Sequence, residues 1–185
     1  MDNGASSYRR FRDGDENGIV DIIREYKDGL MLYLNGYVQN IHVAEDLTED
    51  TFVKIAVRKP RFSGKSSFKT WLFAIGRNVA LDYIRRTRRI SLLCDEEQAL
   101  LQQDEEGVER EYLRDEQKRH LHAALHRLKP EYREVLHLVY FEDFKHPQIA
   151  SVMKKSKKQI ENLVYRAKLS LKSELEKEGF VYEEL

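Results

Sequence analysis

The sequence predicts an all-α protein with two helical domains, joined by a flexible acidic linker, and a helix-turn-helix in the second domain. Its 185 residues include only 9 Gly and 3 Pro, too few turn formers for a sandwich or barrel with many hairpins. Apolar residues make up 41% of the chain. They recur at helical spacing on both sides of residues 87–110, a polar stretch without such a period, which predicts two helical units with a linker between them.

The first domain is predicted to follow a disordered tail at residues 1–13. Apolar residues recur at helical spacing over residues 16–38, which predicts one or two helices, and again over residues 42–57. The segment at 42–57 sets its apolar residues against four acidic ones. Lys59-Pro60 ends this helix, because the residue before a proline disfavours the α conformation.

A loop over residues 61–67 leads into the last helix of the first domain. Ser67 is the predicted N-cap of a helix that runs from Phe68 to about Arg86. Apolar residues spaced by four, three and four predict its inward face: Phe68, Leu72, Ile75 and Val79.

Four helices are predicted in the second domain. The first two span residues 109–128 and 131–141, and a third, short helix has Pro147 in its first turn, where a missing N–H costs nothing. The fourth begins at Ser156, which forms a capping box with Gln159. The short turn between the third and fourth helices is typical of a helix-turn-helix.

The net charge of zero conceals strong segregation along the chain. Residues 13–53 hold ten acidic and two basic residues, a net charge of −8, and residues 95–116 have the same balance. Residues 58–94 have a net charge of +9 and residues 154–172 a net charge of +6. Alternating blocks favour two surfaces for polyanions and two for basic partners, although solvated helix faces are the plainer alternative.

Several classes of protein are excluded or disfavoured. The single cysteine, Cys94, allows no internal disulfide and no zinc site built from several cysteines. No run of 18 apolar residues occurs and residues 1–15 lack the apolar segment of a signal peptide, so a cytoplasmic protein is expected. A histidine cluster could suggest a metal-dependent enzyme, but no third ligand type lies at motif spacing from it: His120, His122 and His126. Solvated histidines are the favoured interpretation, and neither catalytic residues, a metal nor a cofactor is expected.

The outer face of the last helix carries candidate contacts to duplex DNA, since side chains there can reach base edges and phosphates in the major groove. The expected phosphate contacts are Lys157, Lys158 and Arg166. The candidates for base edges are Gln159, Glu161, Asn162 and Tyr165. The alternative is an αα-hairpin with a solvated basic face.

The helix at residues 68–86 mixes aromatic and cationic side chains, which suits single-stranded nucleic acid because rings stack on bases and cations hold phosphates. Its aromatic residues are Trp71, Phe73 and Tyr83, and its cations are Lys69, Arg77, Arg85 and Arg86. The alternative is that the rings belong to the core.

Three groups of segments, taken in order, are more specific than any single motif. Residues 44–52 form the first, and residues 62–64, 67–72 and 74–86 form the second. The third comprises residues 128–136, 140–144, 148–150 and 165–168. Together they resemble the core-binding helix, the promoter-melting region and the C-terminal domain of bacterial RNA polymerase sigma factors of the small extracytoplasmic-function (ECF) group. The resemblance covers about residues 11–176.

The resemblance implies a role for each candidate surface. The acidic helix would bind a coiled coil of the polymerase β′ subunit through Glu45, Asp46, Leu47, Glu49, Asp50 and Phe52. The basic helix and its preceding loop would read and melt the minus-ten element through Phe62, Ser63, Gly64, Lys65, Ser66, Lys69, Trp71, Arg77, Asn78, Arg85 and Arg86. The C-terminal domain would read the minus-thirty-five element.

The resemblance also implies domain limits and partners. A domain like sigma region 2 would span residues 14–90, and one like sigma region 4 would span residues 112–178, followed by a tail at 179–185. The acidic linker at 91–111 would thread through the polymerase toward the RNA exit path. The expected partners are core RNA polymerase, through its β′ and β subunits, promoter DNA and an anti-sigma factor, without insertion into a membrane. A freestanding helix-turn-helix regulator is the alternative, but it leaves the acidic helix at 44–52 unexplained.

One loop carries the sharpest expectation. In ECF factors the matching loop captures an unstacked base of the non-template strand, and Phe62 and Asn78 occupy the matching positions. The alternative is a surface loop in which Phe62 only packs on the following helix. The sequence departs from the family pattern at three places in the helix-turn-helix, which bears on promoter preference: Lys145 stands for a capping Ser or Thr, Lys154 and Lys155 for a Gly and an apolar residue, and Leu163 for an Arg.

Overall fold

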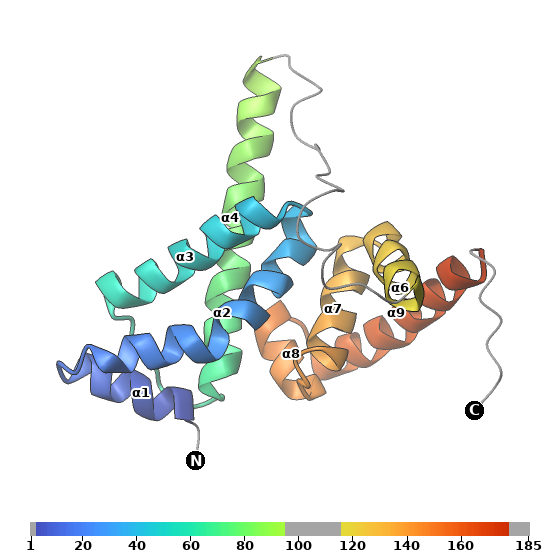
Figure 1. Cartoon of the computed structure of the whole chain (residues 1–185). Coiled ribbons are helices and arrows are strands. Elements are labelled where there is room, and N and C mark those ends of the chain that lie inside the picture. Colours follow the sequence, from blue (N-terminus) through green and yellow to red (C-terminus); the bar gives the residue numbers. More distant parts are fainter. Residues whose placement is uncertain (1–2, 95–115, 178–185) are drawn as a thin grey trace.

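The computed structural model describes residues 3–94 and 116–177, with side chains described for residues 3–90 and 121–177. Within these ranges every regular element is a helix, which confirms the all-α prediction. Figure 1 shows the helices in two groups, α1 to α4 and α6 to α9. The predicted acidic linker falls largely outside the described residues.

The N-terminus is a helix, α1 (Asn3–Arg12), so the prediction of a disordered tail at residues 1–13 is wrong. Tyr8 and Phe11 lie three positions apart on one face of α1 and are 2% and 7% exposed. Gly4 permits the close packing of this helix, because a Cβ atom there would lie 2.5 Å from a ring carbon of Phe68. The tail folds because these few anchors enter an aromatic core that the sequence pattern did not reveal.

Helix α2 (Asn17–Val38) is one continuous helix that packs against α1 and α3 (Ile41–Arg58). The side chain of Asn40 caps α3 by accepting a hydrogen bond from the backbone N–H of Val43, at 3.0 Å. Lys59 ends α3 in the left-handed conformation with φ of 42°, directly before Pro60. The predicted end of this helix is therefore confirmed.

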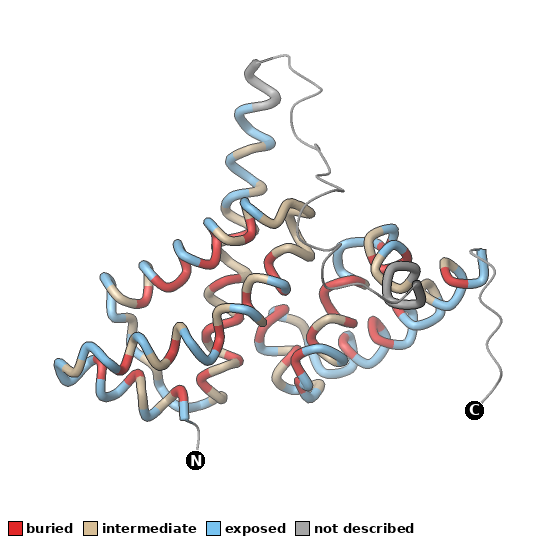
Figure 2. The backbone as a smooth tube through the Cα atoms, viewed as in Figure 1, coloured by how far each residue is buried: buried red, intermediate tan, exposed pale blue. Residues whose placement is uncertain are grey.

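Helix α4 (Phe68–Cys94) begins where predicted, since the Ser67 hydroxyl accepts a hydrogen bond from the N–H of Thr70 at 3.2 Å. It continues past the predicted end at Arg86. Figure 1 shows this C-terminal part standing away from the other helices, and Figure 2 shows it largely exposed as far as residue 90. Periodicity missed the extension because residues 88–90 are exposed and face no core, so no apolar stripe is needed there.

The second group comprises α6 (Glu116–Arg127), α7 (Pro130–Tyr140), α8 (His146–Met153) and α9 (Lys157–Lys177). The predicted capping box at the start of α9 is present. The N–H of Gln159 donates to the Ser156 hydroxyl at 3.2 Å, and the N–H of Ser156 donates to the Gln159 side chain at 2.7 Å. These caps and the prolines fix the helix ends from local chemistry alone.

The two groups pack against each other and share one continuous hydrophobic core. Helix α4 contacts α8, and α2 contacts α7. Figure 1 shows α8 and α7 beside α2 and the lower part of α4. The structure is therefore closed, with the helix-turn-helix resting on the helix that carries the candidate contacts to single-stranded DNA.

Candidate nucleic-acid interface

The outer face of α9 is accessible over its whole predicted length. Its seven candidate DNA contacts are all exposed: Lys157, Lys158, Gln159, Glu161, Asn162, Tyr165 and Arg166. The opposite face packs on α7 and α8 through a buried stripe that includes Ile160, Leu163 and Ala167. Leu163 is thus an inward residue, and its departure from the family pattern changes the core and not the outer face.

The turn before α9 contains a strained backbone position. Lys154 ends α8 with φ of 55° and ψ of 45°, the left-handed conformation in which glycine has no steric penalty. This is the position where the resemblance expects glycine. The neighbouring Lys155 forms an ion pair with Glu131 at 3.1 Å, which ties the turn to α7.

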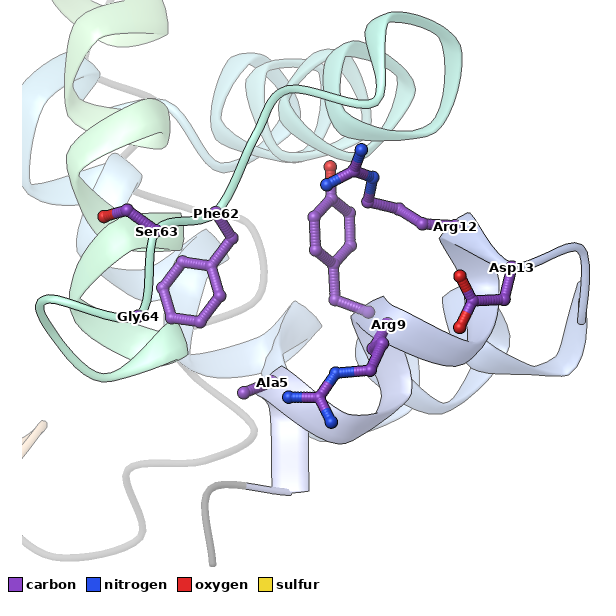
Figure 3. A pocket seen from close by; sticks show the side chains of 8 residues that line it. Ala5, Arg9, Arg12, Asp13, Phe62, Ser63 and Gly64 are labelled. Atoms are coloured by element: carbon purple, nitrogen blue, oxygen red, sulfur yellow. The ribbon is translucent and has the colours of Figure 1, made fainter.

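The loop before α4 borders a cavity of about 370 Å³ (Figure 3). Phe62, Ser63 and Gly64 line it from the loop, and residues of α1 line it from the other side. The Phe62 ring also packs on α4, with its centroid 5.7 Å from that of Phe68 and 5.4 Å from that of Trp71. The two alternatives for Phe62 are therefore not exclusive, because its ring packs on the helix and also borders a cavity.

Other residues predicted for the same site lie elsewhere. Phe73 is fully buried, so for this ring the core alternative holds. The ring of Trp71 is half-buried and packs in a cluster with Tyr8, Phe62 and Phe68. Asn78 does not line the cavity, and its amide N–H donates to the carbonyl of Ala74 on the same helix at 2.8 Å. Lys65 is exposed on the loop, and the Ser66 hydroxyl lies 3.3 Å from the carbonyl of Ser67.

Helix α4 directs part of its basic surface toward the second helical group. Arg77 Nε lies 2.8 Å from Glu134 Oε1, and Lys69 Nζ lies 2.7 Å from Glu142 Oε2. The amide oxygen of Asn78 accepts a hydrogen bond from Lys154 Nζ at 3.3 Å. In contrast, Arg85 and Arg86 are exposed on the protruding part of α4. The first three candidate DNA contacts are therefore engaged within the chain.

The pair between Arg77 and Glu134 is nearly buried, with side chains 13% and 4% exposed. Burial lowers the pKa of Arg77, but the hydrogen bond and the charge of Glu134 outweigh it, so the pKa is raised overall. The Tyr33 hydroxyl donates to the same carboxylate oxygen at 3.0 Å. Burial, followed by the charge of Glu134, raises the pKa of Tyr33 well above its ordinary value. One carboxylate thus links α2, α4 and α7.

The second ion pair between the two helical groups, Lys69–Glu142, is also partly buried. Burial raises the pKa of Glu142, but hydrogen bonds from His137 and Lys69 outweigh it, so the pKa is lowered overall. The side chain of Gln148 on α8 adds a contact to the Ser67 hydroxyl at 3.4 Å, at the start of α4. We call these contacts across the two helical groups the clasp: Arg77–Glu134, Lys69–Glu142, Lys154–Asn78 and Gln148–Ser67.

The acidic face of α3 is also accessible. Asp46, Glu49 and Asp50 are exposed, and Glu45 lies 3.3 Å from Lys27. Two residues predicted for this surface are placed differently, because Leu47 and Phe52 are 3% and 6% exposed and belong to the core. Both hold α3 in position on the core, and Leu47 also lines a cavity beside α4.

The sequence analysis missed apolar residues on the same side of α3. Val53 and Val57 are 57% and 77% exposed, and they line a second cavity of about 410 Å³ between α3 and α4. This cavity also borders Asp50 and Arg86. The four-residue spacing of the valines was the available signal. Lys54, Arg58 and Asp82 line it as well, so the groove combines apolar residues with charges of both signs. Such a groove can receive the apolar face of a partner helix.

Two observations concern other kinds of site. Among residues 3–90 and 121–177, no group of three or more His, Cys, Asp or Glu side chains is arranged to hold a metal ion. In the part of the chain that the structure describes, no helix is long and apolar enough to cross a membrane.

Comparison with known proteins identifies both helical groups. Residues 22–90 match the family described as Sigma-70 region 2, and residues 118–171 match the one described as Sigma-70, region 4. The RNA polymerase sigma factor YlaC of Bacillus subtilis is 28% identical over 162 residues, which cover 87% of this chain and 94% of that protein. The chain belongs to the ECF sigma factors of bacterial RNA polymerase.

Other sigma factors agree with this assignment. The ECF sigma factor SigM of Bacillus subtilis is 26% identical over 155 residues, covering 84% of this chain and 93% of that protein. Among solved structures, CnrH in complex with the cytosolic domain of CnrY has a TM-score of 0.68 at 21% identity and covers 95% of this chain and 98% of that one. The sigma factor RpoE of Bartonella quintana, in complex with the anti-sigma factor NepR, has a TM-score of 0.64 at 24% identity, with coverages of 84% and 97%. These two structures share the fold.

Membership of this family settles the broad function. An ECF sigma factor binds core RNA polymerase and directs it to promoter DNA, which removes the alternative of a freestanding regulator. The family is one of transcription initiation factors.

Proposed function

We propose that this sigma factor stabilises the melted minus-ten element by trapping one unstacked base of the non-template strand in the cavity beside Phe62. The observation that carries the proposal is the cavity of about 370 Å³ on the loop that enters the basic helix α4. A base taken out of the stack needs an apolar or aromatic wall, and Phe62 supplies a ring held in place by Phe68 and Trp71. Gly64, with φ of 71°, leaves nothing within 4 Å of its Cβ position, so backbone and ligand can approach closely.

The remaining surfaces fit the other parts of promoter recognition. The exposed face of α9 reads the minus-thirty-five element, with Lys157, Lys158 and Arg166 on phosphates. The acidic face of α3, with the groove beside Val53 and Val57, binds a basic helical segment of the polymerase β′ subunit. Two similar structures are complexes, CnrH with the cytosolic domain of CnrY and RpoE with the anti-sigma factor NepR, and the second supports an inhibitory partner of this kind here. The domain limits remain as predicted for residues 14–90, 91–111 and 112–178.

The clasp adds a step to this mechanism. Lys69, Arg77 and Asn78 cannot contact promoter DNA while they are bonded to the loop after α7, to α7 itself and to the turn that follows α8. The two domains therefore separate before α4 engages the minus-ten element. The factor acts at its promoter in an open form, and the closed form holds the cations of α4 in internal ion pairs.

Permanganate footprinting on the assembled holoenzyme tests base capture. Removing the ring in Phe62→Ala is expected to lower thymine reactivity in the minus-ten region about tenfold, since base–aromatic stacking contributes about 1–3 kcal/mol. Phe62→Tyr keeps a ring at the same place and is the matched control, with reactivity near that of the parent. Equal reactivity in Phe62→Ala and the parent, at equal occupancy by core polymerase, would contradict the proposal.

A further inference from the structure

Helix α1 supplies half of the cavity wall. Ala5, Tyr8, Arg9, Arg12 and Asp13 line it opposite the loop, and Figure 3 shows Arg9 and Arg12 projecting from α1 on the side that faces Phe62. We infer that α1 is part of a nucleotide-binding site in which Arg9 and Arg12 hold phosphates next to the trapped base. The inference rests on the proposed function and extends it to a segment outside the matched family region at residues 22–90.

Helix α1 is fixed to the loop, and the two form one unit. The Tyr8 hydroxyl donates to the carbonyl of Pro60 at 2.7 Å, at the start of the loop. The Tyr8 ring packs on Phe68 and Trp71, with centroid distances of 5.4 and 5.2 Å. The ammonium of Lys59 lies 4.5 Å from the centroid of the Phe11 ring. Groups on α1 therefore hold a constant position relative to Phe62, as a preorganised binding site requires.

The arginines of α1 differ in what they contact. Arg10 is engaged by Asp15 at 2.6 Å and by Asp21 at 3.1 Å. Arg9 and Arg12 have no ion-pair partner among the residues whose side chains the structure describes, although both border the cavity. Burial raises the pKa of Tyr8, and the charge of Arg12, which lines the same cavity, offsets only part of this effect. Two uncommitted guanidinium groups at one cavity favour an anionic ligand.

The chemistry of the cavity favours a nucleotide over a simple anion. Asp13 also lines it, and a carboxylate repels an inorganic anion but accepts hydrogen bonds from the N–H groups of a base. In Figure 3 the Ser63 hydroxyl lies on the side of the loop away from Arg9 and Arg12. The loop thus supplies the ring and an open backbone position, α1 supplies donors, and Asp13, directly after α1, supplies an acceptor. The ligand is a nucleotide within an unpaired DNA strand, because the loop continues directly into the basic helix α4.

The test measures the affinity of the holoenzyme for two forms of one promoter. One form carries a pre-melted minus-ten bubble, and the other is a full duplex that is kept unmelted by leaving out magnesium. The variant is Arg9→Gln with Arg12→Gln. The control is Arg24→Gln, an exposed arginine on α2 that does not line the cavity. We expect a loss of about tenfold in affinity for the bubble template. The slope of log affinity against log salt should fall by about 1.4, because each single-strand phosphate contact contributes about 0.7.

The outcomes separate this inference from the proposed function. Loss of bubble affinity in the double variant, with closed-duplex binding and the control unchanged, supports the inference. Unchanged bubble affinity in the double variant, while Phe62→Ala still lowers melting, overturns the role of α1 and leaves base capture intact. No effect from either set overturns both. A loss of equal size on the bubble and the duplex also overturns the inference, since it indicates a general charge effect and not a contact to the unpaired strand.

Discussion

The clasp predicts that removing one buried charge shifts the molecule toward the open form. In Glu134→Gln the shape of the side chain is kept, but the ion pair with Arg77 is lost, although a glutamine oxygen can still accept from Tyr33. A hydrogen bond between charged groups contributes about 1.5–3 kcal/mol, and Arg77 would remain buried without its counter-charge in the closed form. In the open form Arg77 regains water, so the substitution penalises only the closed arrangement.

A loss of about 2 kcal/mol changes the ratio of closed to open molecules about 30-fold. A factor that is about 99% closed would then become about three-quarters closed. The change is measured as the distance between spin labels on Arg24→Cys in α2 and Leu169→Cys in α9, in a Cys94→Ser background. Arg24 and Leu169 are exposed, which makes both positions suitable for labelling. We expect a second, longer distance to appear in Glu134→Gln.

Glu131→Gln is the matched control for this experiment. It makes the same chemical change on the same helix, but Glu131 pairs with Lys155 inside the second helical group and its side chain is 58% exposed. Its distance distribution should equal that of the parent. If Glu134→Gln also gives the parent distribution, the buried pair does not hold the domains together, and the reasoning from burial and charge is refuted.

Two further predictions concern α3 and the turn before α9. The double charge reversal Asp46→Lys with Glu49→Lys should weaken binding to core polymerase, and the salt dependence of that binding, in a pull-down titration. The control is Glu25→Lys with Asp28→Lys, two exposed acids at the same spacing on α2, which should leave binding unchanged. An equal loss in both double variants would indicate an effect of net charge. Lys154→Gly should be more stable than Lys154→Ala by about 1 kcal/mol, because both lose the contact to Asn78 but only glycine relieves the left-handed backbone. The stabilities of the two variants are measured by thermal unfolding. If Lys154→Ala is as stable as Lys154→Gly, or more stable, the turn relaxes when the lysine is removed.

Local chemistry made much of the fold predictable. Ser67, the capping box of Ser156 and Gln159, and the prolines near the helix ends act over three or four residues, so their effect is written in the adjacent sequence. The inward stripe of α9 was predictable for the same reason, since burial there follows one helical period. The seven outward residues of α9 follow from that stripe and are all exposed.

The features that escaped prediction depend on contacts between distant segments. Helix α1 has only Tyr8 and Phe11 as large anchors, and the Tyr8 ring is buried against Phe68 and Trp71, which lie far along the sequence. The partners of the basic helix were hidden as well, because Glu134 and Glu142 lie outside the acidic blocks at 13–53 and 95–116. A block of charge indicates a surface, whereas an ion pair depends on one side chain brought close by the fold.

The position of the clasp limits how the closed form can be opened. The acidic face of α3 is exposed in the closed form and lies outside the clasp, so a partner that touches only α3 binds the closed and open forms equally. Such a partner cannot shift the balance between them, however tightly it binds. The exposed face of α9 is subject to the same argument. Opening therefore requires either a partner that competes for Lys69, Arg77 and the surfaces around them, or one rigid surface that binds α3 and α9 at a separation the closed form does not offer. Under the proposed mechanism, core polymerase would act in the second way and the melted strand in the first, so we expect polymerase binding to expose α4 and strand capture to keep it exposed.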